Sequence, residues 1–254
     1  MALLPLKDDN NIVNIRFQYI TLIIIISCVT MFIWQLSLGE ERGTVIYGLG
    51  TIPSVLFGDR QLSPNLFIIP ESVTLFTSLF LHGGWMHLTF NMLFLWVFGD
   101  NIEDSMGHLR FISFYLICGI LATLTHSIIE YNSSSPLIGA SGAISGVLGA
   151  YLVIHPKARI LVLFMNIIPL RLPAIIVLGS WIGIQFFSLG NGTNTAWWAH
   201  IGGFAAGMVL IIPFRKNHVV PPNKWKVLDK GKSIIPPQKT AKTGPSIFPK
   251  SLKK

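Results

Sequence analysis

The sequence FQYITLIIIISCVTMFIWQLSL, residues 17–38, contains no charged side chain and is long enough to cross a bilayer as one helix. Asp8 and Asp9 precede it and no small-residue cleavage pattern follows, so we interpret it as a retained span and not as a signal peptide. Of all 254 residues, 51% are apolar and only 12% are charged, and the mean hydropathy is +0.60. Soluble domains carry about a quarter charged residues, so this composition predicts an integral membrane protein.

Further apolar stretches predict five more membrane helices. The expected helices cover residues 85–99, 111–129, 137–154, 172–189 and 196–214. Pro169, Arg171 and Pro173 interrupt the approach to the fifth helix, so we expect residues 160–170 to pack against the membrane face or to extend a neighbouring helix. Backbone groups in lipid must pair within their own segment, which favours an all-α fold, a bundle of six transmembrane helices.

The distribution of cations predicts the orientation of this bundle. A cytoplasmic N-terminus leaves only Arg42 and Arg60 on the outside, so we expect both termini in the cytoplasm. We divide the chain into a cytoplasmic N-terminal segment (1–16), a six-helix core (17–214) and a basic tail (215–254). The long first loop of the core, residues 40–71, mixes glycine, proline and apolar residues, and we expect it to lie in the membrane interface.

The net charge of +8 is a property of the basic tail, which holds most of the lysines and arginines. The tail combines these cations with prolines and has little apolar material, so we expect it to be disordered and to favour anionic lipid. Because the core itself is not basic, no nucleic-acid partner is expected.

Polar residues gather at the starts of the second, fourth and sixth predicted helices, which all lie in the outer leaflet in this orientation. The second helix opens with HGGWMHLTFN (82–91), the fourth opens with GASG (139–142) and the sixth opens with AHIGG (199–203). At about 1.5 Å of rise per residue, Ser141 and His200 both lie on the order of 6 Å below their helix starts. A polar side chain inside the hydrocarbon is costly and is a functional hypothesis by default.

These residue types permit acyl transfer. Ser141 is a candidate nucleophile and His200 the candidate base that takes its proton. The backbone N–H of Ser141 and the side chains of His87 and Asn91, four residues apart on one helical face, are candidate oxyanion donors. Neither the fourth nor the sixth helix contains Asp or Glu, so we predict a Ser/His dyad whose histidine is held by packing.

Other classes of membrane protein remain in view. The glycines around Ser141 also suit close helix packing, so a non-catalytic protein that binds transmembrane helices is the main alternative. A small transporter would more often show paired repeats and an ionisable midplane site, and neither is found. A metalloprotease is not indicated, because there is no HExxH motif and no third ligand near His82 and His87, so no metal is expected.

Three segments resemble the signatures of rhomboid intramembrane serine proteases: HGGWMHLTFNMLFLWVFG (82–99), GASG (139–142) and AHIGGFAAG (199–207). The resemblance spans residues 72–214. It implies that Ser141 is the nucleophile, His200 the base, and His87 and Asn91 part of the oxyanion pocket. It also implies no metal or organic cofactor, and substrates that are transmembrane segments of other membrane proteins, cut near the outer face.

Four further features complete these expectations. Glu103 and Gly107 resemble a structural E-x-x-x-G element of the family. Ser145 stands where many members have an aromatic residue that stacks on the catalytic histidine, so the group that orients His200 is left open. The first loop also lacks the Trp-Arg pair found in many members. Because no additional N-terminal span or targeting segment is found, we expect a bacterial plasma membrane.

Overall fold

The computed structural model describes residues 3–165, 167–189 and 195–216. Its longer helices are α1 (Tyr19–Ser37), α5 (Trp85–Met106), α6 (His108–Ile129), α7 (Ser141–Ile154), α8 (Ala174–Phe187) and α9 (Trp197–Phe214). The short helices are α2 (Arg42–Leu49), α3 (Pro53–Leu56) and α4 (Thr74–Thr77), with 3₁₀ turns at Gly39–Glu41, Glu71–Val73 and Ser78–Phe80. The strands are β1 (Leu3–Asp8), β2 (Arg159–Phe164) and β3 (Ile168–Pro173).

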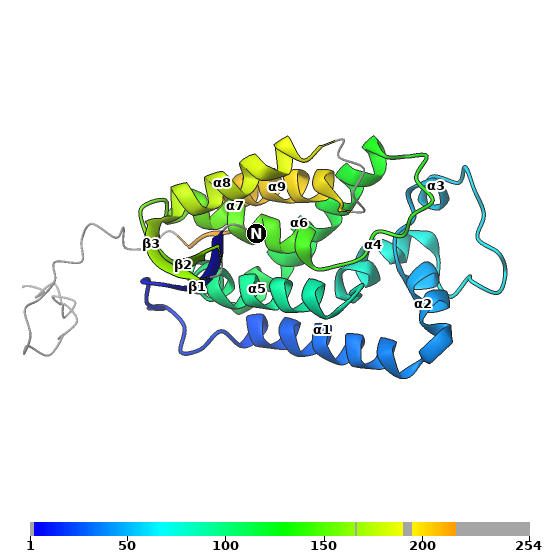
Figure 1. Ribbon diagram of the computed structural model, residues 1–254, viewed down its shortest axis with the longest axis horizontal. Helices are drawn as coiled ribbons and strands as arrows, with labels where there is room; N and C mark the ends of the chain where they lie inside the picture. Colours follow the sequence, from blue (N-terminus) through cyan, green and yellow to red (C-terminus); the bar gives the residue numbers. More distant parts are fainter. Residues whose placement is uncertain (1–2, 166, 190–194, 217–254) are drawn as a thin grey trace, which may run out of the picture. The chain divides into compact units, whose positions relative to one another are not determined.

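The small-residue helix α7 is the centre of the packing. It contacts α5, α6 and α9, while α1 packs on the far side of α5 and α8 packs on α9 (Figure 1). A Cβ atom placed on Gly203 would collide with the carbonyl oxygen of Gly142, and one on Gly207 would collide with that of Gly146. The backbones of α7 and α9 therefore touch directly, which only small residues at the interface permit.

Not every helix is long enough by itself to establish a membrane span. In the described ranges α1, α6 and α9 are long and apolar enough to cross a membrane. Helices α7 and α8 are apolar but have only 14 residues each, and α5 carries carboxylates in its last turns. The helical membrane class is supported, whereas six crossings with both termini in the cytoplasm stay a prediction.

A small antiparallel sheet with strand order β1-β2-β3 was missed by the sequence reading. The expectation that residues 160–170 extend a neighbouring helix is wrong, because residues 160–164 belong to β2 and residues 168–170 to β3. Packing of this segment against the membrane face stays a prediction. Ile160 and Val162 are buried between more exposed neighbours, which is the two-residue period of a strand. Pro169 and Pro173 disfavour a helix in the return strand. The N-terminal segment adds the third strand by pairing with β2.

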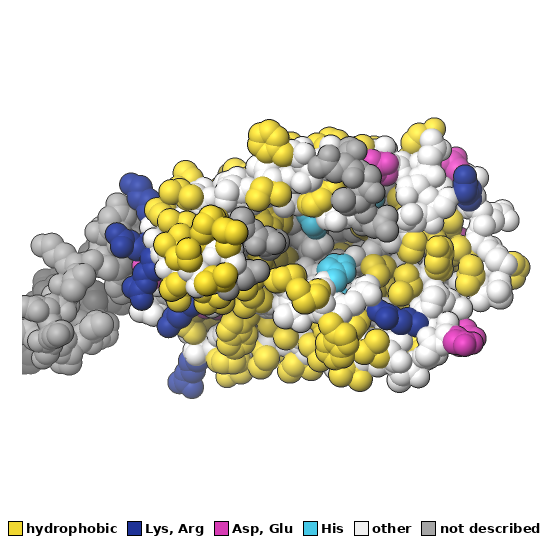
Figure 2. All heavy atoms as spheres, in the orientation of Figure 1, with side chains coloured by type: hydrophobic (Ala, Val, Ile, Leu, Met, Phe, Trp, Pro, Cys, Tyr) yellow, Lys and Arg dark blue, Asp and Glu magenta, His cyan; other side chains and the backbone are white. Residues whose placement is uncertain are grey.

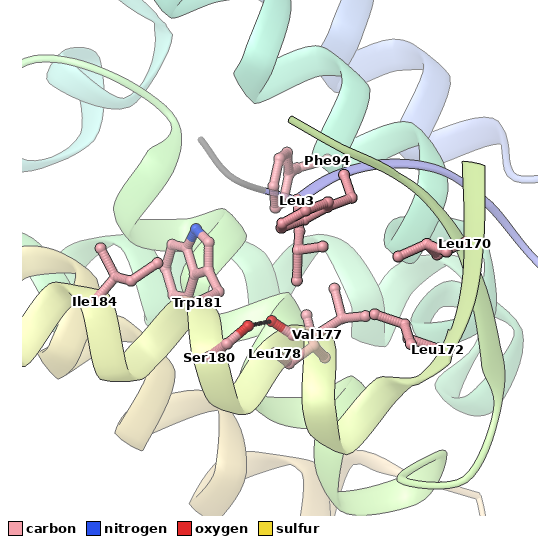
Figure 3. Close-up of a pocket in the computed structure, with 10 residues that line it drawn as sticks. Leu3, Phe94, Leu170, Leu172, Val177, Leu178, Ser180, Trp181 and Ile184 are labelled. Atoms are coloured by element: carbon pink, nitrogen blue, oxygen red, sulfur yellow. Dashed lines mark hydrogen bonds between the residues drawn. The ribbon is translucent and has the colours of Figure 1, made fainter. Parts of the chain in front are cut away.

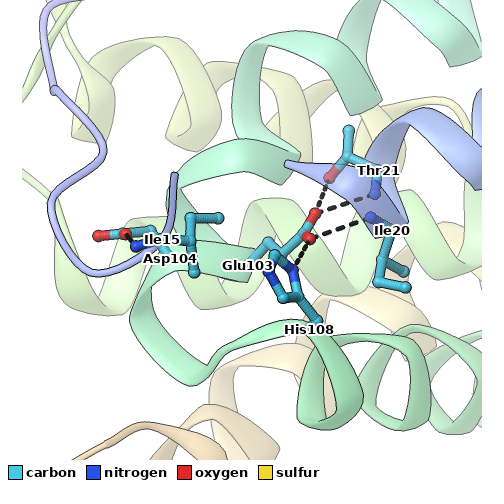
Figure 4. A network of polar contacts seen from close by, with 6 residues as sticks. All are labelled: Ile15, Ile20, Thr21, Glu103, Asp104 and His108. Carbon is cyan, nitrogen blue, oxygen red and sulfur yellow. Dashed lines mark hydrogen bonds and ion pairs between the residues drawn. The ribbon is translucent and has the colours of Figure 1, made fainter. Parts of the chain in front are cut away.

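Polar contacts between α5 and the N-terminal segment tie the start of the chain to the bundle (Figure 4). Asp104 accepts backbone N–H bonds from Val13, Asn14 and Ile15 at 3.1, 2.6 and 2.8 Å. The fully buried Glu103 accepts the N–H groups of Ile20 and Thr21, at 3.0 and 2.9 Å, in the first turn of α1. Helix α1 receives no side-chain cap from its own N-cap residue, so Glu103 supplies that cap from another helix.

The strand β1 is anchored through a buried carboxylate. Asp8 Oδ2 accepts hydrogen bonds from the Tyr151 hydroxyl at 2.5 Å and from Asn101 Nδ2 at 2.9 Å. Asp8 is only 7% exposed, and its burial raises the pKa of this carboxyl from 3.8 to about 7, although the bond from Tyr151 acts in the opposite direction. The folded protein therefore holds a proton at Asp8 that the unfolded chain releases at lower pH.

This difference predicts how stability depends on pH. As pH rises from about 4 to about 7, the unfolded chain binds fewer protons at Asp8 than the folded protein does, so the parent should lose stability across this interval and level off above it. In an Asp8→Asn variant, which keeps an oxygen acceptor, the midpoint of thermal unfolding in detergent should fall less over the same interval. Identical pH dependence in both proteins would contradict the assignment, since the other titrating groups are common to both.

The two ends of the helix bundle differ in charge. The strands lie at one end, and α2, α3 and α4 of the first loop lie at the other (Figure 1). Lysine and arginine side chains gather at the strand end (Figure 2). Arg42 begins α2 and Arg60 follows α3, so these two cations belong to the first-loop end. The orientation with both termini in the cytoplasm stays a prediction. The basic tail beyond Lys216, with its expected disorder and lipid preference, lies outside the described residues.

Candidate functional site

Ser141 is the first residue of α7, and the chain reaches it through a conformation that favours glycine. Gly139, two residues earlier, has a φ of +122°, and its N–H donates to the carbonyl of Ser78 at 2.9 Å. A Cβ atom at this position would lie 2.7 Å from the His87 ring, so both the backbone angle and the available space favour glycine. The GASG segment thus brings the α5 imidazole close to the start of α7.

The structure brings Ser141 and His200 together. His200 lies in the first turn of α9, and its Nε2 atom is 2.9 Å from the Oγ atom of Ser141. This hydrogen bond crosses the same α7–α9 interface at which Gly203 meets Gly142. The close approach of the two backbones lets short side chains 59 positions apart in the sequence touch.

The other ring nitrogen of His200 contacts a residue that the sequence reading missed. His200 Nδ1 lies 2.7 Å from Oε1 of Gln185 in α8. The amide nitrogen of Gln185 donates to the Trp181 carbonyl at 3.0 Å in its own helix, so the amide oxygen is the atom that faces the imidazole. Nδ1 therefore donates its proton to Gln185, and Nε2 is left to accept the proton of the Ser141 hydroxyl.

A signal for Gln185 was present in the sequence. A glutamine stands inside the apolar stretch 172–189, and a polar side chain in a predicted membrane span has a functional reading by default. Ser145, which occupies the place of the family's aromatic residue, instead donates to the Ser141 carbonyl at 2.6 Å. The aromatic neighbours of His200 come from other positions. The ring centroids of Trp181 and Trp197 lie 5.7 and 6.1 Å from that of His200.

The candidate oxyanion residues, His87 and Asn91, lie on α5. Their side chains are next to Gly139, which stands two residues before the first residue of α7. A Cβ atom at Gly139 would lie 2.7 Å from His87 Nε2 and 3.8 Å from Asn91 Nδ2, so both side chains face this point. The Gly83 N–H points to His87 Nδ1 at 3.4 Å, which favours a proton on Nε2. Within the described part of the chain, the buried Nδ2 of Asn91 has no hydrogen-bond partner. Donors without acceptors therefore converge near the start of α7.

His82, by contrast, is held as part of the scaffold. Its side chain is fully buried, and its Nδ1 atom lies 3.2 Å from the Phe80 carbonyl. Gln35 of α1 accepts the His82 N–H at 3.1 Å, and Arg42 donates to the His82 carbonyl at 3.2 Å. These contacts position the segment that leads into α5 and hence His87.

An apolar cavity of about 330 Å³ lies between α5, α8 and the three strands (Figure 3). Phe94 of α5, Leu3 of β1 and Trp181 of α8 are among its lining residues, and none of these lining residues is titratable. The one lining hydroxyl, that of Ser180, is bonded to the Val177 carbonyl at 2.9 Å. The cavity itself has no groups for catalysis, but it borders the site because the Trp181 ring also contacts His200.

Comparison with known proteins matches this sequence to one family. Residues 70–217 match the family model described as "Rhomboid domain". The Rhomboid protease GluP of Bacillus subtilis is 34% identical over 159 residues, which cover 63% of this chain and 30% of that protein. Rhomboid protein 1, mitochondrial, of Saccharomyces cerevisiae is 28% identical over 176 residues, 65% of this chain and 48% of that protein.

A longer match is found to the Presenilin-associated rhomboid-like protein A, mitochondrial, of Danio rerio. It is 28% identical over 218 residues, which cover 78% of this chain and 54% of that protein. The chain therefore spans between about a third and about half of the length of these curated relatives.

Proposed function

This chain belongs to the rhomboid family, and on that premise we propose that it is an intramembrane serine endopeptidase that acts through a Ser141/His200 dyad. The observation that carries the proposal is the 2.9 Å contact between Ser141 Oγ and His200 Nε2. It is supported by the contact of Nδ1 with Gln185, which leaves Nε2 as the basic atom. A serine that served helix packing alone would not need an imidazole in this tautomer at its hydroxyl.

The proposed reaction begins when His200 Nε2 takes the proton of the Ser141 hydroxyl as Oγ attacks the carbonyl carbon of the scissile peptide bond. The negative charge that develops on the carbonyl oxygen is received by the Ser141 N–H, His87 and Asn91. The imidazolium of His200 then gives its proton to the leaving amine. Water hydrolyses the acyl-enzyme with His200 again acting as base, which restores the Ser141 hydroxyl.

The proposed substrates are transmembrane segments of other membrane proteins. A substrate helix would enter from the side, and a helix-breaking stretch near its outer end would unwind toward Ser141. Small residues at the cut site would suit the pocket that the family resemblance implies. The apolar cavity between α5 and α8 supports lateral entry, because it offers apolar surface next to Trp181 and hence next to His200. Hydrolysis also needs water from the outer face.

The membrane in which this chain acts is a separate question. The helical membrane class and the family make it an integral membrane protein. The bacterial plasma membrane stays a prediction, because the relatives include one from Bacillus subtilis and others whose names are mitochondrial.

Labelling with a serine-reactive fluorophosphonate tests the proposed function without a known substrate. The full chain in detergent should be labelled, and Ser141→Ala and His200→Ala should reduce labelling to background, because the first removes the nucleophile and the second the base. The matched control is Ser113→Ala on α6, whose hydroxyl bonds only within its own helix, and it should label like the parent.

Two outcomes would count against an enzyme. Labelling that persists in Ser141→Ala would remove the nucleophile assignment. A folded parent that is never labelled, yet still binds transmembrane helices, would favour the non-catalytic alternative.

A further inference from the structure

The amide oxygen of Gln185 in α8 faces the imidazole of His200 in α9. Gln185 is only 3% exposed, although it stands on a predominantly apolar helix. Its amide nitrogen is satisfied by the Trp181 carbonyl one turn earlier in α8, so the oxygen is the end that reaches another helix. The partner of that oxygen is Nδ1 of His200 at 2.7 Å.

We propose that Gln185 is the positioning residue of the catalytic pair, because its amide oxygen holds the Nδ1–H tautomer of His200 and aims Nε2 at Ser141. This inference rests on the proposed function, since it assigns to Gln185 the orienting part that a carboxylate has in a Ser/His/Asp triad. Ser141 and His200 are then the two residues that react, and Gln185 is a third residue that orients the histidine without reacting.

The other neighbours of His200 among the described residues cannot perform this task. Trp181 and Trp197 contact the ring and limit its tilt, but a tryptophan side chain carries only an N–H donor and cannot accept a proton from Nδ1. Ser145 directs its hydroxyl to the Ser141 carbonyl. Without an acceptor at Nδ1, the neutral imidazole could carry its proton on Nε2, where it could not accept the proton of the serine.

A neutral amide suits this environment better than a carboxylate would. Within the described residues, the titratable groups that act on His200 are two other imidazoles, His87 of α5 and His126 of α6, and neither is a permanent cation that would compensate a buried anion at neutral pH. A buried carboxylate without such a partner is costly and would favour imidazolium over the neutral base. Gln185 selects the tautomer without adding charge to the site.

Two substitutions separate positioning from simple packing. Gln185→Met keeps the length of the side chain and removes the acceptor, whereas Gln185→Glu keeps an acceptor oxygen and adds charge. The control is Ser188→Ala, which removes a polar group one turn later at the end of α8. All proteins are used as full chains in detergent. The readouts are the fluorophosphonate labelling rate as a function of pH, and kcat and KM for a transmembrane reporter substrate.

We expect Gln185→Met to reduce the labelling rate and kcat on the order of tenfold or more while KM changes little, because the base is misoriented and substrate binding is untouched. Gln185→Glu should retain most of the labelling. It should also move the acid limb of the rate profile to higher pH by about one unit, because a carboxylate stabilises the imidazolium form. Ser188→Ala should behave like the parent.

Parent-like rates and pH profiles in both Gln185→Met and Gln185→Glu would overturn the proposal. If Gln185→Met does not fold, Gln185→Glu decides: a shifted acid limb supports the positioning role and an unshifted one overturns it. These outcomes are distinct from failure of the proposed function, which would appear as a parent that is not labelled or as labelling that survives Ser141→Ala.

Discussion

A Gly207→Val variant is expected to lose serine-reactive labelling to background and to unfold at a much lower temperature than the parent. A Cβ atom at Gly207 would collide with the carbonyl oxygen of Gly146, a backbone atom that cannot rotate away as a side chain could. Overpacking a core typically costs about 1–3 kcal/mol, and more where backbone must move. Helices α7 and α9 would have to separate, and the Ser141–His200 hydrogen bond lies across this interface.

The measurement pairs thermal unfolding in detergent with fluorophosphonate labelling. The matched control is Gly179→Val in α8, where a Cβ atom would meet nothing within 4 Å. It introduces the same β-branched residue into a helix, so it should show only the small cost of helix propensity. If Gly207→Val labelled at the parent rate, close contact of α7 and α9 would not be what holds the site together.

A Glu103→Leu variant is expected to be strongly destabilised, because it removes a fully buried carboxylate that has several hydrogen-bond partners. The carboxylate accepts four hydrogen bonds: the N–H groups of Ile20 and Thr21, the Thr21 hydroxyl at 2.8 Å, and one shared with His108 Nδ1 at 2.5 Å (Figure 4). Each buried donor left without a partner costs about 1–3 kcal/mol. Helix α1 would also lose the side-chain cap that Glu103 provides at Ile20 and Thr21.

The midpoint of thermal unfolding should therefore fall strongly in Glu103→Leu and less in Glu103→Gln, which keeps one acceptor oxygen but presents an amide donor to the remaining N–H groups. Glu40→Leu is the control, because Glu40 is exposed in a 3₁₀ turn at the other end of α1. A Glu103→Leu protein as stable as the control would show that α1 does not depend on this cap.

The longer helices could be predicted because each one corresponds to a continuous apolar stretch of the sequence. Uncharged apolar stretches predicted each of the longer helices, and all of these helices are present. Two boundaries differ most: α5 continues to Met106 beyond the predicted end at residue 99, and α7 begins at Ser141 and not at residue 137. The hairpin of β2 and β3 was missed because Pro169, Arg171 and Pro173 obscure the two-residue alternation of a strand. The apolar stretch therefore resembled a helix interrupted by proline. Strand β1 was missed because it is stabilised by pairing with β2, which lies about 150 residues away in the sequence.

The sequence alone determined the helical membrane class, the family resemblance and the types of residue at the candidate site, because hydrophobic runs and short motifs are local properties of the chain. Only the tertiary structure decided that Gln185 of α8 contacts His200, and that β1 pairs with β2 as the third strand of the sheet. Those pairings depend on the rotation and depth of each helix relative to its neighbours. The contacts of Gly203 and Gly207 with the α7 backbone fix the rotation and depth of α9 relative to α7. The sequence pattern of a single helix does not contain this information.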